Sequence, residues 1–347
     1  MRLNPLTRKA LRRFMSIRRG YWSAIVLVVL LFLSMFAELL ANSRALIVSY
    51  QHKLYFPSYG SIIPGRVFGL DYDYETNYRQ LKELIQEQAL DGWVLMPPIP
   101  YNPYENHFVK GKYPPTAPDW LQRHYLGTDV AGRDVAARLL YGFRTAMAFS
   151  LILLISNYVV GIALGCLMGY SGGIFDLLFQ RLIEIWSNVP FLYVIMIIAS
   201  FVVPDFWTLI LIMVMFGWMS MTWYMRTSTY KEKARAYVSA ARALGASTTR
   251  ILFYHILPNS VYIVVTFIPF SVVSGITALT ALDFLGFGLP PPTPSWGEIL
   301  REGTDNLHAP WIASSVVAAL VMVLTMVTFV GEAIREAFDP KKYTFYR

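Results

Sequence analysis

The run TAMAFSLILLISNYVVGIALGCLMGYSGGIF, residues 145–175, decides the fold class because it contains no charged residue. A bilayer core of roughly 30 Å needs about 20 apolar residues in a helix, so this run is long enough to cross a membrane. Charged residues make up only 15% of the 347-residue chain, whereas soluble domains carry about a quarter. The sequence therefore predicts an all-α membrane protein.

Six long apolar stretches follow one another along the chain. They cover residues 21–41, 145–175, 175–203, 206–225, 260–282 and 310–331. Gly169, Gly172 and Gly173 separate the second stretch from the third, and closely spaced glycines are typical of a tight turn. A single continuous helix would far exceed the bilayer thickness. We therefore expect two helices here and six transmembrane helices in total.

The distribution of basic residues predicts the orientation, because lysine and arginine near the ends of spans stay in the cytoplasm. Residues 1–20 hold seven basic residues and no acid, and residues 226–259 hold six basic residues against Glu232. The loop after the fifth stretch is acidic instead, with Asp283, Glu298, Glu302 and Asp305. We expect both termini in the cytoplasm, including the tail 334–347 with Arg335, Lys341, Lys342 and Arg347. The net charge of +8 then reflects topology and requires no nucleic acid.

Residues 42–144 are expected outside the membrane. The region is rich in tyrosine, tryptophan and proline, and Leu81, Leu84 and Ile85 have helical spacing within 78–90. We interpret it as a small aromatic-rich cap on the membrane surface; the alternative is a long ordered linker. The first apolar stretch also resembles a signal peptide, but Ala41-Asn42-Ser43 is a poor cleavage site, so we expect a retained helix.

Motifs for catalysis or cofactor binding are absent from the sequence. There is no G-x-x-x-x-G-K-[ST] phosphate loop, no G-x-S-x-G elbow and no H-E-x-x-H. The single cysteine, Cys166, excludes an intramolecular disulfide and cysteine-based zinc sites. The five histidines show no metal-ligand spacing: His52, His107, His124, His255 and His308. We therefore expect a non-catalytic chain without a cofactor or metal of its own.

The most informative basic segment is the loop 226–259, which contains SAARALG at 239–245 and HILPN at 255–259. Small residues on one side of a short helix allow another protein to approach the backbone closely, and Gly245 permits a left-handed helix end. We expect a second helix over 248–257, interrupted at Pro258. The segment is a candidate dock for a partner; a plain surface helix turn is the alternative.

This segment resembles the E-A-A-x-x-x-G…I-x-L-P signature of permease subunits in ATP-binding-cassette (ABC) importers. In that family the helix is a coupling helix, which fits a cleft of the ATPase. The resemblance implies ATPase coupling by Ser239, Ala240, Ala241, Leu244, Gly245, Leu257 and Pro258. The family's leading acid is replaced by Ser239, which places any charged contact from this position in doubt.

Two further blocks are similar to the second permease subunit of dipeptide and oligopeptide importers. LGTDVAGRD at 126–134 with LYG at 140–142 is one, and DFLGFG at 283–288 with PPTPSWG at 291–297 is the other. The outer motifs YFP at 55–57 and GWVL at 92–95, together with LTALD at 279–283, resemble the Yej branch of peptide importers. Together with the coupling segment, the two blocks give a resemblance to these permeases over residues 126–340.

The resemblance implies a type I ABC importer transmembrane domain. Its parts would be a cytoplasmic segment (1–20), a first helix (21–41), an extended periplasmic insertion (42–144), a permease core (145–333) and a tail (334–347). Implied partners are a second permease in a heterodimer, ATPase subunits that bind ATP and Mg as two chains or one fused double cassette, and a periplasmic peptide-binding protein. The implied cargo is short peptides, including peptide-nucleotide antibiotics of the microcin C type, across the bacterial inner membrane.

Polar residues within the expected spans are candidates for the pathway or for helix packing. Arg181 and Glu184 are three residues apart, hence on one helix face, and intramembrane charges commonly line pathways or pair. They also lie close enough to the cytoplasmic end for their side chains to reach the surface. Asn157 and Asn188 are the other candidates, and for both we favour interhelical hydrogen bonding over contact with a substrate.

Three rival functions remain open at this point. A permease for another solute would share all the features above. A motor-independent secondary transporter would need charges deep in several spans for ion coupling, and the last three apolar stretches have none. A membrane enzyme would have to use Asp129, Asp134 and His124, the one outer cluster of such residues; we interpret both aspartates as loop and helix-start residues.

Overall fold

The computed structural model describes residues 5–87, 91–108 and 111–338. Five helices are long and apolar enough to cross a membrane, and a bent helix pair makes a sixth span. The five are α2 (Arg18–Met35), α5 (Val135–Ser171), α8 (Phe206–Lys233), α11 (Leu257–Leu285), which continues the helical turns from Thr248, and α13 (Pro310–Phe338). The all-α fold with six spans is thus confirmed, with the third span in two pieces.

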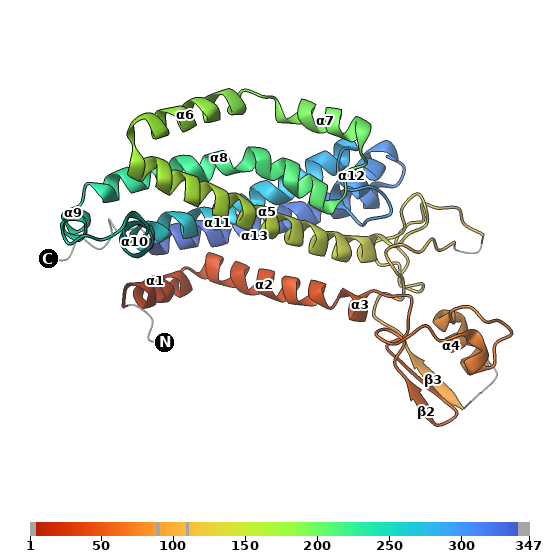
Figure 1. Cartoon of the computed structure of the whole chain (residues 1–347). Helices are drawn as coiled ribbons and strands as arrows, with labels where there is room; N and C mark the ends of the chain where they lie inside the picture. The colour runs from red at the N-terminus through yellow and green to blue at the C-terminus, as the bar shows by residue number, and fades with distance from the viewer. Residues whose placement is uncertain (1–4, 88–90, 109–110, 339–347) are drawn as a thin grey trace.

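The third span, expected as one stretch over 175–203, is a bent pair of helices. Helix α6 (Gly173–Ser187) and helix α7 (Phe191–Phe201) meet at an angle of 69°. Pro190 lies in the break, where its missing N–H and its restricted neighbour disfavour a continuous helix. Figure 1 shows the pair along one edge of the bundle, outside α8 and α5.

The centre of the bundle is the tight pairing of α5 with α8. Three glycines four residues apart on α5, Gly161, Gly165 and Gly169, face α8 so closely that an added Cβ would lie 2.8, 2.6 and 2.6 Å from α8 atoms. Small residues at this spacing let membrane helices approach backbone to backbone. Gly169 is therefore a packing residue, and its assignment to the turn was wrong. The turn itself is made by Gly172 and Gly173, both with positive φ.

One end of the bundle carries both chain termini and three short elements. Figure 1 places α1 (Pro5–Ser16), α9 (Ala236–Ala243) and α10 (Thr248–Ile251) there, opposite the insertion. Helix α1 was not expected, and its Arg13 pairs with Glu336 of α13 at 3.8 Å. The basic residues expected to mark this end include some outside the described residues, namely Arg2, Lys341, Lys342 and Arg347.

The insertion at the other end is a folded unit and not a linker. Strands β1 (Ile47–Tyr50), β2 (Lys53–Tyr55) and β3 (Gly92–Leu95) form an antiparallel sheet in the order β2-β1-β3. Helix α4 (Tyr78–Glu87), which the apolar spacing predicted, covers one face of this sheet; residues 88–90 of that prediction lie outside the described range. Their shared core consists of Ala45, Val48, Phe68, Tyr78, Leu81, Ile85, Val94 and Met96. The 3₁₀ turn η1 (Gly65–Phe68) supplies Phe68.

Two short helices connect the insertion and the last loop to the bundle. Helix α3 (Ala37–Leu40) extends α2 toward the insertion, and α12 (Trp296–Asp305) lies between α11 and α13. Asp134 caps the N-terminus of α5 by accepting from Ala137 N at 2.7 Å, as a helix-start residue should. Helix α5 therefore begins ten residues before the expected start of the second span at residue 145, because this cap precedes the apolar run.

Candidate functional site

Helix α9 is a short exposed helix at the end of the bundle opposite the insertion. Val238 is fully buried and fixes the helix to the bundle, whereas Ser239, Ala240 and Leu244 are exposed, Leu244 by 88%. Ala241 is half-buried against the same core. A protruding leucine beside small side chains is a surface that a partner could enclose without moving the helix.

Gly245 ends α9 in the left-handed conformation expected of it. Its φ is +79°, Gly245 N bonds Arg242 O, and Ala246 N bonds Ala241 O, both at 3.0 Å. This is the Schellman pattern, in which glycine carries the positive φ without strain. No described atom lies within 4 Å of a Cβ placed at Gly245. The helix end therefore faces open space.

The chain returns to the membrane through a π-helical turn, which differs from the expected break at Pro258. Helix α10 passes into the π turn η2 (Leu252–Ile256), and α11 starts at Leu257 with Pro258 in its first turn. Proline is tolerated there because the first-turn N–H groups have no intrahelical partner. The helix thus continues through Pro258, and the statement that Pro258 interrupts it was wrong. Leu257 is half-buried and Pro258 is exposed.

Tyr237 ties α9 to both neighbouring spans, and sequence reasoning missed it. Its hydroxyl donates to Glu232 Oε2 of α8 at 2.6 Å and accepts from Asn259 Nδ2 of α11 at 3.1 Å. Burial, followed by the hydrogen bond to Glu232, raises the pKa of Tyr237 to about 12. The hydroxyl therefore stays protonated at neutral pH, and a shift of α9 acts on α8 and α11 together.

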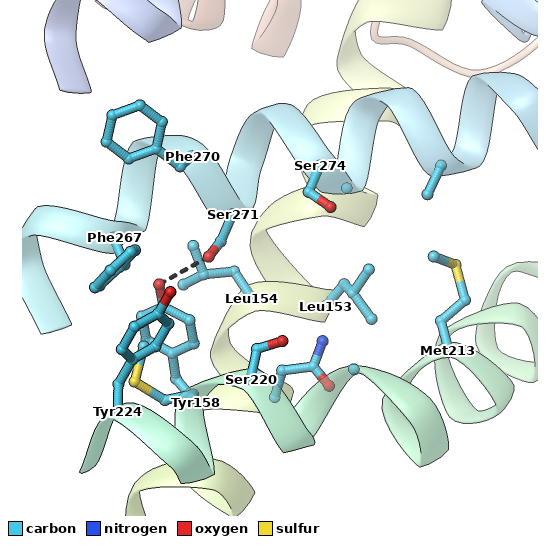
Figure 2. Close-up of a pocket in the computed structure, with 15 residues that line it drawn as sticks. Leu153, Leu154, Tyr158, Met213, Ser220, Tyr224, Phe267, Phe270, Ser271 and Ser274 are labelled. Atoms are coloured by element: carbon cyan, nitrogen blue, oxygen red, sulfur yellow. Dashed lines mark hydrogen bonds between the residues drawn. The ribbon is translucent and has the colours of Figure 1, made fainter. Parts of the chain in front are cut away.

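A second feature is a partly open pocket of about 360 Å³ that is lined by α5, α8 and α11, with Ser220 and Ser274 exposed in it. Figure 2 shows Ser220 from α8 facing Ser271 and Ser274 from α11 across it. The Tyr158 hydroxyl and Ser271 Oγ form a hydrogen bond of 2.8 Å. Tyr224, Phe267 and Phe270 contribute aromatic surface at one end. Such a combination of apolar walls with a few hydroxyl groups is typical of small-molecule sites.

Asn157 of α5 belongs to this cavity. Its Oδ1 is buried and accepts no hydrogen bond from the described residues. Gly217 of α8 makes room for the amide, since an added Cβ there would lie 2.3 Å from Asn157 Nδ2. A buried carbonyl without a donor is costly, so this atom is available to an N–H of a molecule in the cavity.

The other predicted polar residues are gathered on α6, away from this cavity. Arg181 Nη1 and Glu184 Oε2 form an ion pair of 2.5 Å, and both side chains are exposed. Asn188 donates to Glu184 O at 2.6 Å and caps its own helix. The structure therefore brings Arg181, Glu184 and Asn188 together and leaves Asn157 on a separate element.

At the opposite end, a buried ion cluster joins the block at 126–134 to α12. Arg138, with no exposed surface, lies among Asp129, Glu298 and Glu302, and Arg133 completes the group. Arg133 Nη2 is 2.7 Å from Glu302 Oε1. The sequence offered one signal for it, an arginine four residues after the helix cap Asp134 at the edge of an apolar run. Asp129 is thus a structural residue in a loop, as expected.

The enzyme alternative finds little support in this region. His124 Nδ1 lies 2.7 Å from Asp134 Oδ2, and its Nε2 lies 3.1 Å from His107 Nδ1. His124 and Asp134 are both buried, and Asp134 is already occupied as a helix cap. Within the described ranges, no three or more His, Cys, Asp or Glu side chains are grouped so that they could hold a metal ion. The cluster anchors His107 and His124 to the start of α5.

Residues 161–342, more than half of the chain, match the family described as "Binding-protein-dependent transport system inner membrane component". The chain belongs to this family. The permease is 41% identical over 98% of its length, and 99% of the relative, to the inner membrane ABC transporter permease protein YejE of Escherichia coli (strain K12). It is 39% identical, over 98% of its length and 94% of the relative, to the peptidoglycan transport system permease protein YejE of Agrobacterium fabrum.

The oligopeptide transport system permease protein OppC of Lactococcus lactis is a more distant relative. It is 33% identical over 64% of the permease and 76% of the relative. The family match begins at residue 161, whereas the match to the Escherichia coli protein covers almost the whole chain, the insertion included. The permease is therefore a multi-span inner-membrane transport component, and its insertion is shared with the relatives that cover its full length.

Proposed function

We propose that the permease carries short peptides across the inner membrane by alternating access, driven by separate ATPase subunits that bind ATP and Mg. The observation that carries the proposal is the geometry of α9. Its small, exposed surface ends in an open glycine turn, and its Tyr237 is bonded to both adjoining spans. A partner that grips α9 would therefore move α8 and α11 together.

The cavity supports the same mechanism because α8 and α11 form two of its walls. Closure of an ATPase pair would displace α9, and the two helices would then change the shape of the cavity. The coupling residues in this proposal are Ser239, Ala240, Ala241, Leu244, Gly245, Leu257 and Pro258. No covalent step occurs in this chain; hydrolysis takes place in the partner.

Peptide as the cargo is supported by the chemistry of the cavity and by the names of the relatives. A peptide presents N–H and C=O groups, which match the Asn157 carbonyl and the hydroxyls of Ser220, Ser271 and Ser274. The relative from Lactococcus lactis is named for oligopeptide transport and that from Agrobacterium fabrum for peptidoglycan transport. Peptides from the cell wall are therefore the second candidate cargo, and peptide-nucleotide antibiotics of the microcin C type remain an expectation.

The orientation follows from charge. The end with α1, α9 and α10 carries the basic segments, so it would face the cytoplasm and the insertion would face the periplasm. A peptide-binding protein would deliver cargo at the insertion side. A second, different permease would complete the pathway, and the ATPase would be two chains or one fused double cassette.

The test is affinity purification of the tagged permease in mild detergent, followed by identification of the co-purifying chains and by uptake into proteoliposomes. We expect an ATPase and a second permease to be recovered, and peptide uptake to require ATP and both partners. Uptake by the purified permease alone would overturn the proposal. Uptake of a non-peptide solute with all partners present would overturn only the cargo.

A further inference from the structure

The sheet of the insertion exposes an apolar face. Three of its residues are exposed to solvent, with exposed fractions of 60% for Leu54, 48% for Trp93 and 46% for Leu95. Ile47 and Ser49 are half-buried on the same face. We call Ile47, Ser49, Leu54, Trp93 and Leu95 the outer sheet face. None of these residues is charged.

The strand register shows that these residues share one side. Ser49 is paired with Leu54 on one neighbouring strand and with Trp93 on the other, and Ile47 is paired with Leu95. Directly opposed residues of antiparallel strands point to the same face. The alternate residues Val48 and Val94 are buried under α4. The outer sheet face is therefore the side that the insertion's own core leaves uncovered.

This composition is unusual for a sheet with one face in water. Antiparallel sheets of that kind alternate apolar and polar residues along each strand. Here β3 reads GWVL, with apolar side chains on both sides. Isolated exposed apolar residues need no explanation, but a contiguous set rarely remains in water. Such a face is typical of a surface that contacts a partner or a membrane.

The position of the sheet distinguishes between the two. Ile99 N donates to Leu40 O at 2.9 Å and Asn42 N donates to Ile99 O at 3.1 Å, so the insertion is bonded directly to the end of α3. Ile99 lies only four positions after Leu95, which is about 13 Å of extended chain. The sheet therefore begins close to the level at which the first span leaves the hydrocarbon layer.

The surface that leads to the sheet is itself apolar and exposed on the first span. Phe32 and Met35 on α2, Phe36 between the helices and Leu39 on α3 are all exposed. In Figure 1 the insertion extends sideways past the line of α2, on the side away from α5 and α8, and α4 covers the far side of the sheet. The outer sheet face thus continues the exposed apolar surface of the first span.

We propose that the outer sheet face lies on the headgroup layer of the outer leaflet. The insertion would then contact the membrane surface beside the first span. Trp93 on β3 is the main anchor, because tryptophan favours the membrane–water interface. Leu95 on the same strand and Leu54 on the other edge strand, β2, add apolar area, and the absence of charge among the five residues avoids a desolvation cost. The proposal concerns membrane contact alone and does not depend on the cargo or on coupling.

The experiment places a fluorescent label on the face in lipid nanodiscs. Leu54→Cys and Leu95→Cys are each labelled in a Cys166→Ala background, so that the introduced cysteine is the single thiol of the protein. The native thiol of Cys166 is buried. Tyr74→Cys is the matched control; it is 69% exposed on the insertion and lies outside the sheet. Lipids with a headgroup-level quencher should remove roughly half or more of the emission at Leu54 and Leu95, since interfacial faces are buried ~5–10 Å into this layer. The Tyr74 label should lose little.

Equal quenching at the sheet and at Tyr74 would overturn the proposal. So would a sheet label that stays unquenched in lipid but becomes protected when the periplasmic binding protein is added, because the face would then bind protein. As a second test, Trp93→Glu in the Leu95→Cys protein should restore most of the Leu95 emission, whereas Tyr74→Glu should not. Unchanged quenching with Trp93→Glu, in a protein whose far-UV circular dichroism is native, would also contradict the contact.

Discussion

Arg138 Nη2 lies 2.6 Å from Glu298 Oε2, which joins the first turn of α5 to the first turn of α12 across 160 residues of sequence. Asp129 and Glu302 contact the same guanidinium, and Arg133 balances part of their charge. Three carboxylates and two guanidiniums are thus buried together. Each member depends on the others for its charge to be tolerated away from water.

Removing Arg138 should be strongly destabilising. Arg138→Ala leaves three buried carboxylates with only Arg133, and breaking a buried pair costs about 3–5 kcal/mol. Arg181→Ala is the matched control because it breaks an exposed pair, which is worth at most about 1 kcal/mol. Denaturant titration in detergent measures both. Similar losses for the two variants would contradict a structural role for the cluster.

Leu244→Glu should abolish recovery of the ATPase while the permease still inserts. The side chain is 88% exposed at the end of α9, and burying a new carboxylate in the partner's cleft carries a large desolvation cost. Co-purification from membranes measures the effect. Leu121→Glu, equally exposed but on the insertion, should retain the ATPase. Full ATPase recovery with Leu244→Glu would argue that α9 is a plain surface turn.

Tyr237→Phe should uncouple hydrolysis from transport without loss of ATPase binding. The variant removes the hydroxyl that bonds Glu232 and Asn259, and each such hydrogen bond contributes about 1 kcal/mol. We expect ATP turnover to continue and peptide uptake per ATP to fall. Tyr254→Phe serves as control, since its ring is exposed in the π turn outside this network. Equal coupling ratios in both variants would exclude Tyr237 as a link.

Ser274→Leu should reduce peptide uptake by filling the cavity between α5, α8 and α11. The added side chain replaces a hydroxyl and occupies space that a cargo would need. Ser200→Leu is the control, because Ser200 is exposed on α7 and its hydroxyl donates to Ile197 O of its own helix. Uptake assays in proteoliposomes distinguish them. Normal uptake with Ser274→Leu, at unchanged ATPase recovery, would remove this cavity from the pathway.

Acidification should weaken the anchoring of the insertion through His107. Burial, followed by the nearby charge of Arg79 and the neighbouring His124, lowers the pKa of His107 from its usual 6.5, against the opposing effect of Glu105 and Asp134. The unfolded segment then binds a proton more readily than the folded one, so stability is complete above pH 6.5 and falls as pH drops below it. Hydrogen exchange of residues 111–134 should rise over this window.

His107→Phe should flatten that pH dependence because it removes the titrating group. His308→Phe, which replaces an exposed histidine outside the cluster, should leave it unchanged. A pH profile that is the same in the native protein and in His107→Phe would assign the effect to another group.

Features encoded by local pattern were predictable from sequence. The uncharged runs predicted the spans, Asp134 predicted a helix start, and Gly245 predicted a left-handed helix end. Each depends only on residues within a turn or two of itself. The spacing of Leu81, Leu84 and Ile85 likewise predicted α4, although not the sheet it covers.

Features that depend on distant partners were not predictable. Gly169 was assigned to the turn because it lies near Gly172 and Gly173. The local sequence does not show that Thr229, on another helix, packs against it. The strands of the insertion are only three or four residues long, too short for a clear alternation. The Arg138 cluster draws on residues 129 to 302 and needs the folded chain to bring them together. Tyr237 is similar, since its partners are on two different helices.

The hydrogen bond between Asn42 and Ile99 places the two ends of the intervening segment next to each other at the end of α3. Residues 43–98 therefore form an inserted segment whose first and last residues are neighbours in space. Its removal at that junction would cost the bonds of Arg79 to Pro100 and Glu105, but the contacts of His107 with His124, of Thr116 with Thr128 and of the capped start of α5 would be kept. A deletion of residues 50–115 would not end at such a junction. It would also remove His107 and so disrupt the contacts around His124.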